Sequence, residues 1–170
     1  MSVTEQTRSV VWNELFDVAR TARYYDGAVR KYALRRYVVR FLAALGAMGA
    51  FTVSVDILPE SLQVLAPVFP LALLVVLVVD MTTRFDAQLA LLTRARHDYN
   101  RLEGDWKILW ASASAPETAD ADIVARINEL RDSEQMVAAW VGGAQVGTMK
   151  RLRDRIDAET YQAIEGQYAA

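Results

Sequence analysis

The chain has 170 residues, of which 53% are hydrophobic and 24% are charged, and its net charge is −2. This slightly acidic balance argues against nucleic acid as a partner, because phosphate binding needs a basic surface. The chain has no cysteine and a single histidine, His97. Disulfides, thiol catalysis and most zinc-enzyme designs are therefore excluded, and we expect no metal and no cofactor.

Residues 1–36 are predicted to form a long cytoplasmic helix. Apolar side chains recur there at spacings of four and three residues, which is the heptad-like stripe of a helix that packs on a partner. Glycine at position 27 weakens such a helix by about 1 kcal/mol relative to alanine. The stripe comprises Val11, Leu15, Val18, Ala22, Tyr25, Val29 and Tyr32.

Residues 37–82 are predicted to form a transmembrane hairpin. A spanning helix needs about 20 mostly apolar residues. The run FLAALGAMGAFTVSV approaches this length once Tyr37 to Arg40 is included, and the run from Ser61 to Val79 carries no charge. A soluble helical hairpin is the alternative, but the rest of this small chain has little to wrap two such apolar helices. We place the membrane helices at about 37–57 and 61–82, with an outer loop at 56–61.

The flanking charges predict the orientation of this hairpin. Lysine and arginine are frequent before the first run and after the second, whereas the connecting segment DILPESLQ has neither. The positive-inside rule then places both termini in the cytoplasm and the loop outside. We therefore expect a multi-pass protein of the bacterial cytoplasmic (inner) membrane, with the lipid bilayer as its first partner.

Small residues on the first membrane helix predict close helix packing. Ala43 and Ala47 form one small-xxx-small pair, and Gly46 and Ala50 form another. In lipid, such residues allow two helix backbones to approach each other closely. Their partner is either the second helix of the same hairpin or another copy of the protein, and the pattern does not choose between them.

Asp80 ends the second apolar run and needs a charged partner. Arg84 lies four residues further on the same helix face. Arg40 lies at the cytoplasmic end of the other helix, so an interhelical pair between Arg40 and Asp80 is expected. An interfacial ion pair fits better than a role in ion conduction, because Asp80 is not deep in the bilayer.

Residues 83–111 are predicted to continue the second arm as a helix packed antiparallel against the first segment. Its apolar positions keep helical spacing, so its aromatic residues belong to a core rather than to a ligand cage. These positions are Phe85, Leu89, Leu92, Tyr99, Leu102, Trp106 and Leu109. Residues 112–170 are interpreted as a linker and two further helices, which completes an all-α fold.

No residue pattern in the chain names a reaction. The segment GGAQVGTMK resembles a phosphate loop in outline, but Thr148 occupies the place of the required lysine. His97 has no nucleophile in a recognisable arrangement. A basic cluster at Lys150, Arg151, Arg153 and Arg155 could touch anionic lipids or form a solvated face. We expect a protein that is not an enzyme.

The layout of the chain resembles a family of small bacterial two-transmembrane proteins, the SLATT-type effectors. The segment ARYYDGAVRKYALRRY leads into a small-residue-rich membrane helix, and YNRLEGDWKILW lies on the long helix after the second one. The resemblance implies a membrane effector that often forms pores beside a sensor or signalling protein in antiphage defence. We therefore predict a homo-oligomeric, pore-forming or membrane-perturbing protein; the alternative is a membrane scaffold that recruits a soluble partner.

Overall fold

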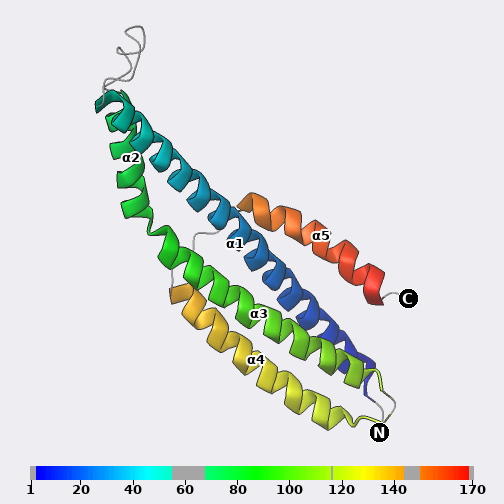
Figure 1. Ribbon diagram of the computed structural model, residues 1–170. Coiled ribbons are helices and arrows are strands. Elements are labelled where there is room, and N and C mark those ends of the chain that lie inside the picture. Colours follow the sequence, from blue (N-terminus) through cyan, green and yellow to red (C-terminus); the bar gives the residue numbers. More distant parts are fainter. Residues whose placement is uncertain (1–2, 55–67, 116, 144–149, 169–170) are drawn as a thin grey trace. The chain divides into compact units, whose positions relative to one another are not determined.

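The computed structural model describes residues 3–54, 68–115, 117–143 and 150–168, and all its regular elements there are helices (Figure 1). Side chains are described outside 50–54, 69, 80–83, 150–151 and 164–168. The predicted all-α class is confirmed. The helices are α1 (Glu5–Ser54), α2 (Val68–Thr83), α3 (Phe85–Ala113), α4 (Asp120–Gly143) and α5 (Lys150–Tyr168).

The chain forms two compact units, which we call the bundle (Met1–Val29 with Ala90–Ala170) and the hairpin (Arg30–Leu89). α1 runs without interruption from residues of the bundle into residues of the hairpin. The boundary predicted between residues 36 and 37 therefore falls inside one continuous helix.

The bundle has up-down-up-down topology, which follows from the contacts that α1 makes. α3 runs antiparallel to α1, because Trp12 contacts Trp110 near one end and Tyr25 contacts Tyr99 further along. α4 runs parallel to α1, from a Thr4–Asp120 hydrogen bond to a Glu14–Arg131 ion pair. α5 runs antiparallel again, with Phe16 against Tyr161 and Gly27 against Leu152.

Most positions of the predicted stripes lie in the core of this bundle, but Val29 and Tyr32 of α1 and Phe85 and Leu89 of α3 are only half-buried. Val11, Leu15, Val18, Ala22 and Tyr25 of α1 are buried. Their counterparts on α3 are Leu92, Tyr99, Leu102, Trp106 and Leu109, which are buried as well. The rings of Tyr25 and Tyr99 stack with their centroids 5.2 Å apart. Their expected place in a core is confirmed.

An N-cap determines where α1 begins, and a glycine on α1 determines where α5 packs. Thr4 is the N-cap, because its Oγ1 accepts a hydrogen bond from the amide of Thr7 at 3.2 Å. Asp120 joins the first turn of α4 to this cap by accepting the amide hydrogen of Thr4 at 2.9 Å. Gly27 lies under α5, where an added Cβ would be 3.1 Å from a methyl group of Leu152. The glycine that weakens the helix therefore makes room for a neighbour.

The hairpin pairs the second half of α1 with α2 in antiparallel orientation. Gly46 lies against Leu73, and Arg40, earlier on α1, bonds to Asp86, later in the chain. Between α2 and α3, Arg84 has a positive φ of 43°. This left-handed conformation is uncommon for a residue with a side chain and ends α2 without a glycine. The expected outer loop, 56–61, lies outside the described residues.

We predict that Trp106→Ala destabilises the bundle by about 3–5 kcal/mol, because it empties a fully buried site. Ile108→Ala on the same helix is the control, since that side chain is 67% exposed; it should change the free energy of unfolding by less than about 0.5 kcal/mol. Denaturant unfolding followed by circular dichroism measures both. Equal effects of the two substitutions would contradict this core.

The bundle should lose stability at high pH through Tyr99. Burial, followed by the nearby Tyr25 and Glu134, raises the pKa of Tyr99 from 10.0 to about 12. The folded state therefore holds the proton more tightly than the unfolded state, and the stabilisation present below pH 10.0 is lost as pH rises toward about 12. Tyr99→Phe should flatten the dependence of the unfolding free energy on pH over this range. Tyr161→Phe, at an exposed position, should leave it as steep as in the parent chain.

Candidate functional site

The two hairpin helices touch where a glycine removes the side chain between them. Gly46 is buried. A Cβ added there would lie 3.2 Å from Cβ of Leu73 and 3.4 Å from its Cα. Because one of these atoms is backbone, a Cβ at this position would require α1 and α2 to move by a few tenths of an ångström. Leu73 of the same hairpin is therefore the partner of Gly46.

The other predicted packing residues do not share this contact equally. Ala43 is half-buried, Ala47 is exposed, and the side chain of Ala50 lies outside the described residues. The small-residue pattern therefore divides between an inner position at Gly46 and an outer one at Ala47. The sequence left two possible partners open, and for Gly46 the structure shows a contact with the second helix of the same hairpin.

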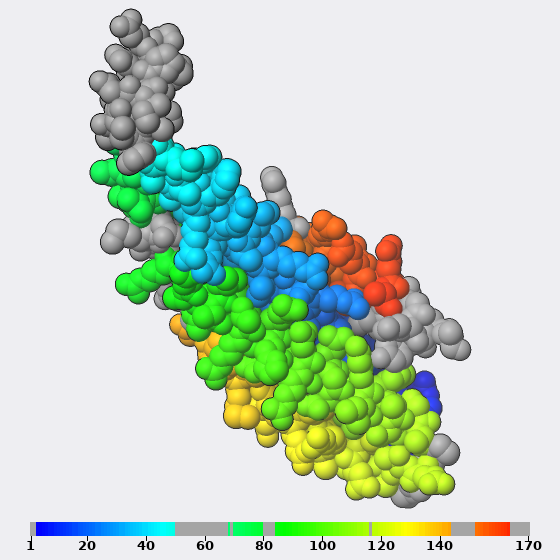
Figure 2. All heavy atoms as spheres, in the orientation of Figure 1, coloured from blue at the N-terminus to red at the C-terminus, as the bar shows by residue number. Residues whose placement is uncertain are grey.

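The rest of the hairpin presents an extensive exposed surface of large apolar side chains, which we call the apolar surface. Tyr37, Met48 and Leu71 are exposed by 68%, 66% and 65%. On α2, only Leu73 and Val76 of the described side chains are even half-buried. Figure 2 shows the α1 part of this surface, coloured light blue to cyan, facing the viewer. Its members are Leu34, Tyr37, Val38, Phe41, Leu42, Leu45 and Met48 on α1, and Val68, Leu71, Leu74, Val75, Leu77, Val78 and Val79 on α2.

Over the residues that the structure describes, no helix is both long enough and apolar enough to cross a bilayer. The described part of α2 has 16 residues, which extend over roughly 24 Å.

A cluster of charges lies beside the apolar surface. Asp86, in the first turn of α3, pairs with Nε of Arg36 at 2.7 Å and with Nη2 of Arg40 at 2.8 Å. Arg40 was predicted to pair with Asp80, whose side chain lies outside the described residues. Arg84 is exposed at the junction between α2 and α3. Asp86 could not be identified from the sequence, because the register between the two hairpin arms was not known. Asp80 was chosen instead because it ends the apolar run.

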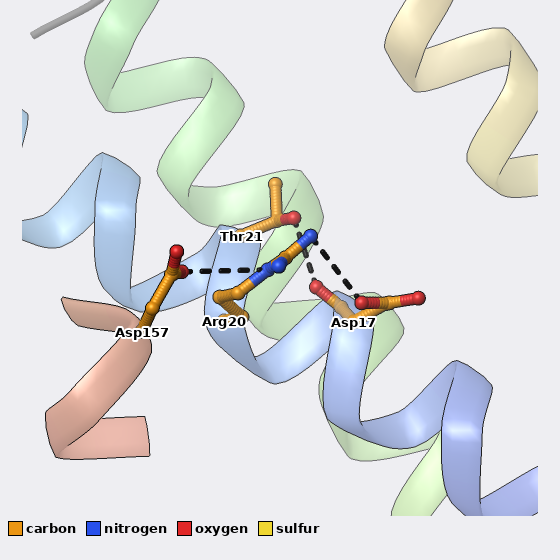
Figure 3. Close-up of polar contacts among 4 residues, drawn as sticks. All are labelled: Asp17, Arg20, Thr21 and Asp157. Carbon is orange, nitrogen blue, oxygen red and sulfur yellow. Dashed lines mark hydrogen bonds and ion pairs between the residues drawn. The ribbon is translucent and has the colours of Figure 1, made fainter. Parts of the chain in front are cut away.

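The bundle also has clefts on its surface. A cavity of about 160 Å³ between α1 and α5 is lined by Arg20, Tyr24, Arg153 and Asp157, among others. Figure 3 shows Arg20 between two carboxylates, Asp17 at 3.3 Å and Asp157 at 3.7 Å. Its charge is thus balanced within the protein.

A histidine, a metal site and a phosphate loop were also weighed from the sequence as possible chemical sites. His97 is exposed on α3. Within the described ranges, no three metal-ligating side chains come together. The glycine-rich segment GGAQVGTMK falls largely on residues 144–149, outside the described residues.

Comparisons with protein-family models, curated proteins and solved structures give no match to this chain. The candidate site is therefore the hairpin itself.

We predict that Gly46→Leu separates α1 from α2 and lowers the melting temperature of the purified protein. Ala47→Leu adds the same side chain one residue away at an exposed position, so it should melt within about 1 °C of the parent, as surface substitutions do. Thermal unfolding of both variants in one detergent measures the difference. If Ala47→Leu proved the more harmful, the assigned packing face would be wrong.

Proposed function

We propose that the hairpin lies in the cytoplasmic membrane and that lipid covers its apolar surface. The observation that carries this proposal is the exposure of large apolar side chains along both arms. Each square ångström of such surface costs about 25 cal/mol in contact with water. Contiguous apolar patches of this kind mark membrane or protein contacts.

The charges around the hairpin support one orientation. Arg30 and Lys31 precede Leu34, the first residue of the apolar surface on α1, and Arg84 follows Val79, the last on α2. The sequence between Asp56 and Gln63 has no lysine or arginine. Under the positive-inside rule, the bundle and both termini then lie in the cytoplasm.

We further propose that the protein is a non-enzymatic effector that oligomerises in the membrane and permeabilises it. With Gly46 used inside the hairpin, contacts between copies would form through the outer apolar surface, including Ala47. Permeabilisation is the activity implied by the resemblance to the SLATT-type effectors, and a cytoplasmic sensor or signalling protein is the expected trigger.

A membrane anchor that recruits a soluble partner is the second candidate. The observation that favours it is the same Gly46–Leu73 contact, because the closest small-residue packing is satisfied within one chain. The core of the bundle disfavours it, since the apolar stripes of α1 and α3 are buried against each other and are not exposed to a soluble partner.

Dye release from liposomes containing the purified oligomer tests the proposed function. We expect release from vesicles with the parent protein and none with Leu74→Asp, because an acidic residue at the centre of a membrane helix costs about 2.5–3.5 kcal/mol of insertion free energy. Met136→Asp, at an exposed position of the bundle, is the control and should leak like the parent. Inserted protein in vesicles that stay tight would contradict the effector and support the anchor.

A further inference from the structure

We propose that two and a half turns of α1 beside the apolar surface bind the headgroups of anionic phospholipids. The site consists of Lys31, Arg35, Arg36 and Arg40, which we call the basic band. This inference rests on the proposed insertion of the hairpin into a membrane, and it names the lipid class that the protein prefers.

The basic band is a set of cations that the local sequence leaves unbalanced. Lys31 and Arg35 are exposed, and no aspartate or glutamate occurs between Arg30 and Ser54. Asp86 is shared by Arg36 and Arg40, so one carboxylate meets two guanidinium groups. The Arg40 side chain remains 52% exposed in spite of this contact. The band therefore keeps positive charge that an anion can neutralise.

Aromatic and apolar side chains lie between these cations on the same helix. The Arg35 guanidinium is 5.8 Å from the ring centroid of Tyr32. Tyr37 and Phe41 are stacked with their centroids 6.4 Å apart, and both are exposed. Aromatic rings of this kind are typical of the level of lipid headgroups.

This combination favours a lipid over a free phosphate ion or a nucleic acid. A soluble anion would use the cations alone, whereas the neighbouring apolar residues, such as Leu34 at 63% exposure, need acyl chains to cover them. Arginine and tyrosine then occupy the boundary between headgroup and hydrocarbon. Each basic residue near an anionic surface contributes about 1 kcal/mol, which corresponds to about a fivefold gain in affinity.

Native mass spectrometry of the full-length protein in detergent tests the inference. The probes are phosphatidylglycerol and phosphatidylcholine with identical acyl chains, and inorganic phosphate is added as a competitor. The test variant is Lys31→Gln/Arg35→Gln, which spares the arginines that pair with Asp86. Arg101→Gln/Arg153→Gln removes the same charge from exposed positions of the bundle.

We expect phosphatidylglycerol to be retained over phosphatidylcholine, with a loss of about fivefold for each charge removed from the band. The control variant should keep the preference, and Asp86→Asn should increase it by releasing both arginines. Equal retention of the two lipids, an equal loss in the control variant, or a decrease with Asp86→Asn would overturn the inference. Displacement of the lipid by millimolar phosphate would identify a free-anion site instead and overturn it as well.

Alkaline extraction of cell membranes separates this inference from the proposed function. Protein that leaves the membrane pellet would contradict insertion itself. Protein that stays in the pellet but shows no preference between the two lipids would contradict only the basic band.

Discussion

The backbone contact between α1 and α2 at Gly46 is the constraint on which the hairpin depends. Because Leu73 fills the place that a side chain would take, the two arms pack through a narrow inner face. Their larger apolar side chains are then left on the outside. The same geometry that closes the hairpin therefore leaves a surface of large apolar side chains exposed.

α1 also belongs to the bundle, whose helices pack around a core of buried apolar side chains. Its first half contacts α3 through stacked tyrosines, α4 through the Glu14–Arg131 pair and α5 through Gly27. In the bundle, apolar side chains of α1 point into a protein core; in the hairpin, Leu34 to Met48 point outward. One helix thus carries two opposite patterns of burial.

Helical periodicity reports directly on burial, so the sequence predicted much of the core that α1 and α3 share. Of the positions chosen for their spacing, those from Val11 to Tyr25 and from Leu92 to Leu109 are buried, whereas Val29, Tyr32, Phe85 and Leu89 are half-buried. The contacts between individual side chains of different helices could not be predicted in the same way, because they depend on the register between helices far apart in the chain. Asp86 was missed as the partner of Arg40 for this reason, and the contact of Gly27 with Leu152 is equally invisible to periodicity.

The central claim is that lipid covers the apolar surface, and the depth of a single label tests it most directly. The chain has no native cysteine, so Leu74→Cys and, as a control in the bundle, Met136→Cys can each carry one environment-sensitive fluorophore. In reconstituted vesicles, the label at position 74 should be quenched by spin-labelled acyl chains and protected from aqueous iodide, and the label at 136 should behave in the opposite way. Quenching of the position 74 label by iodide alone would contradict the account.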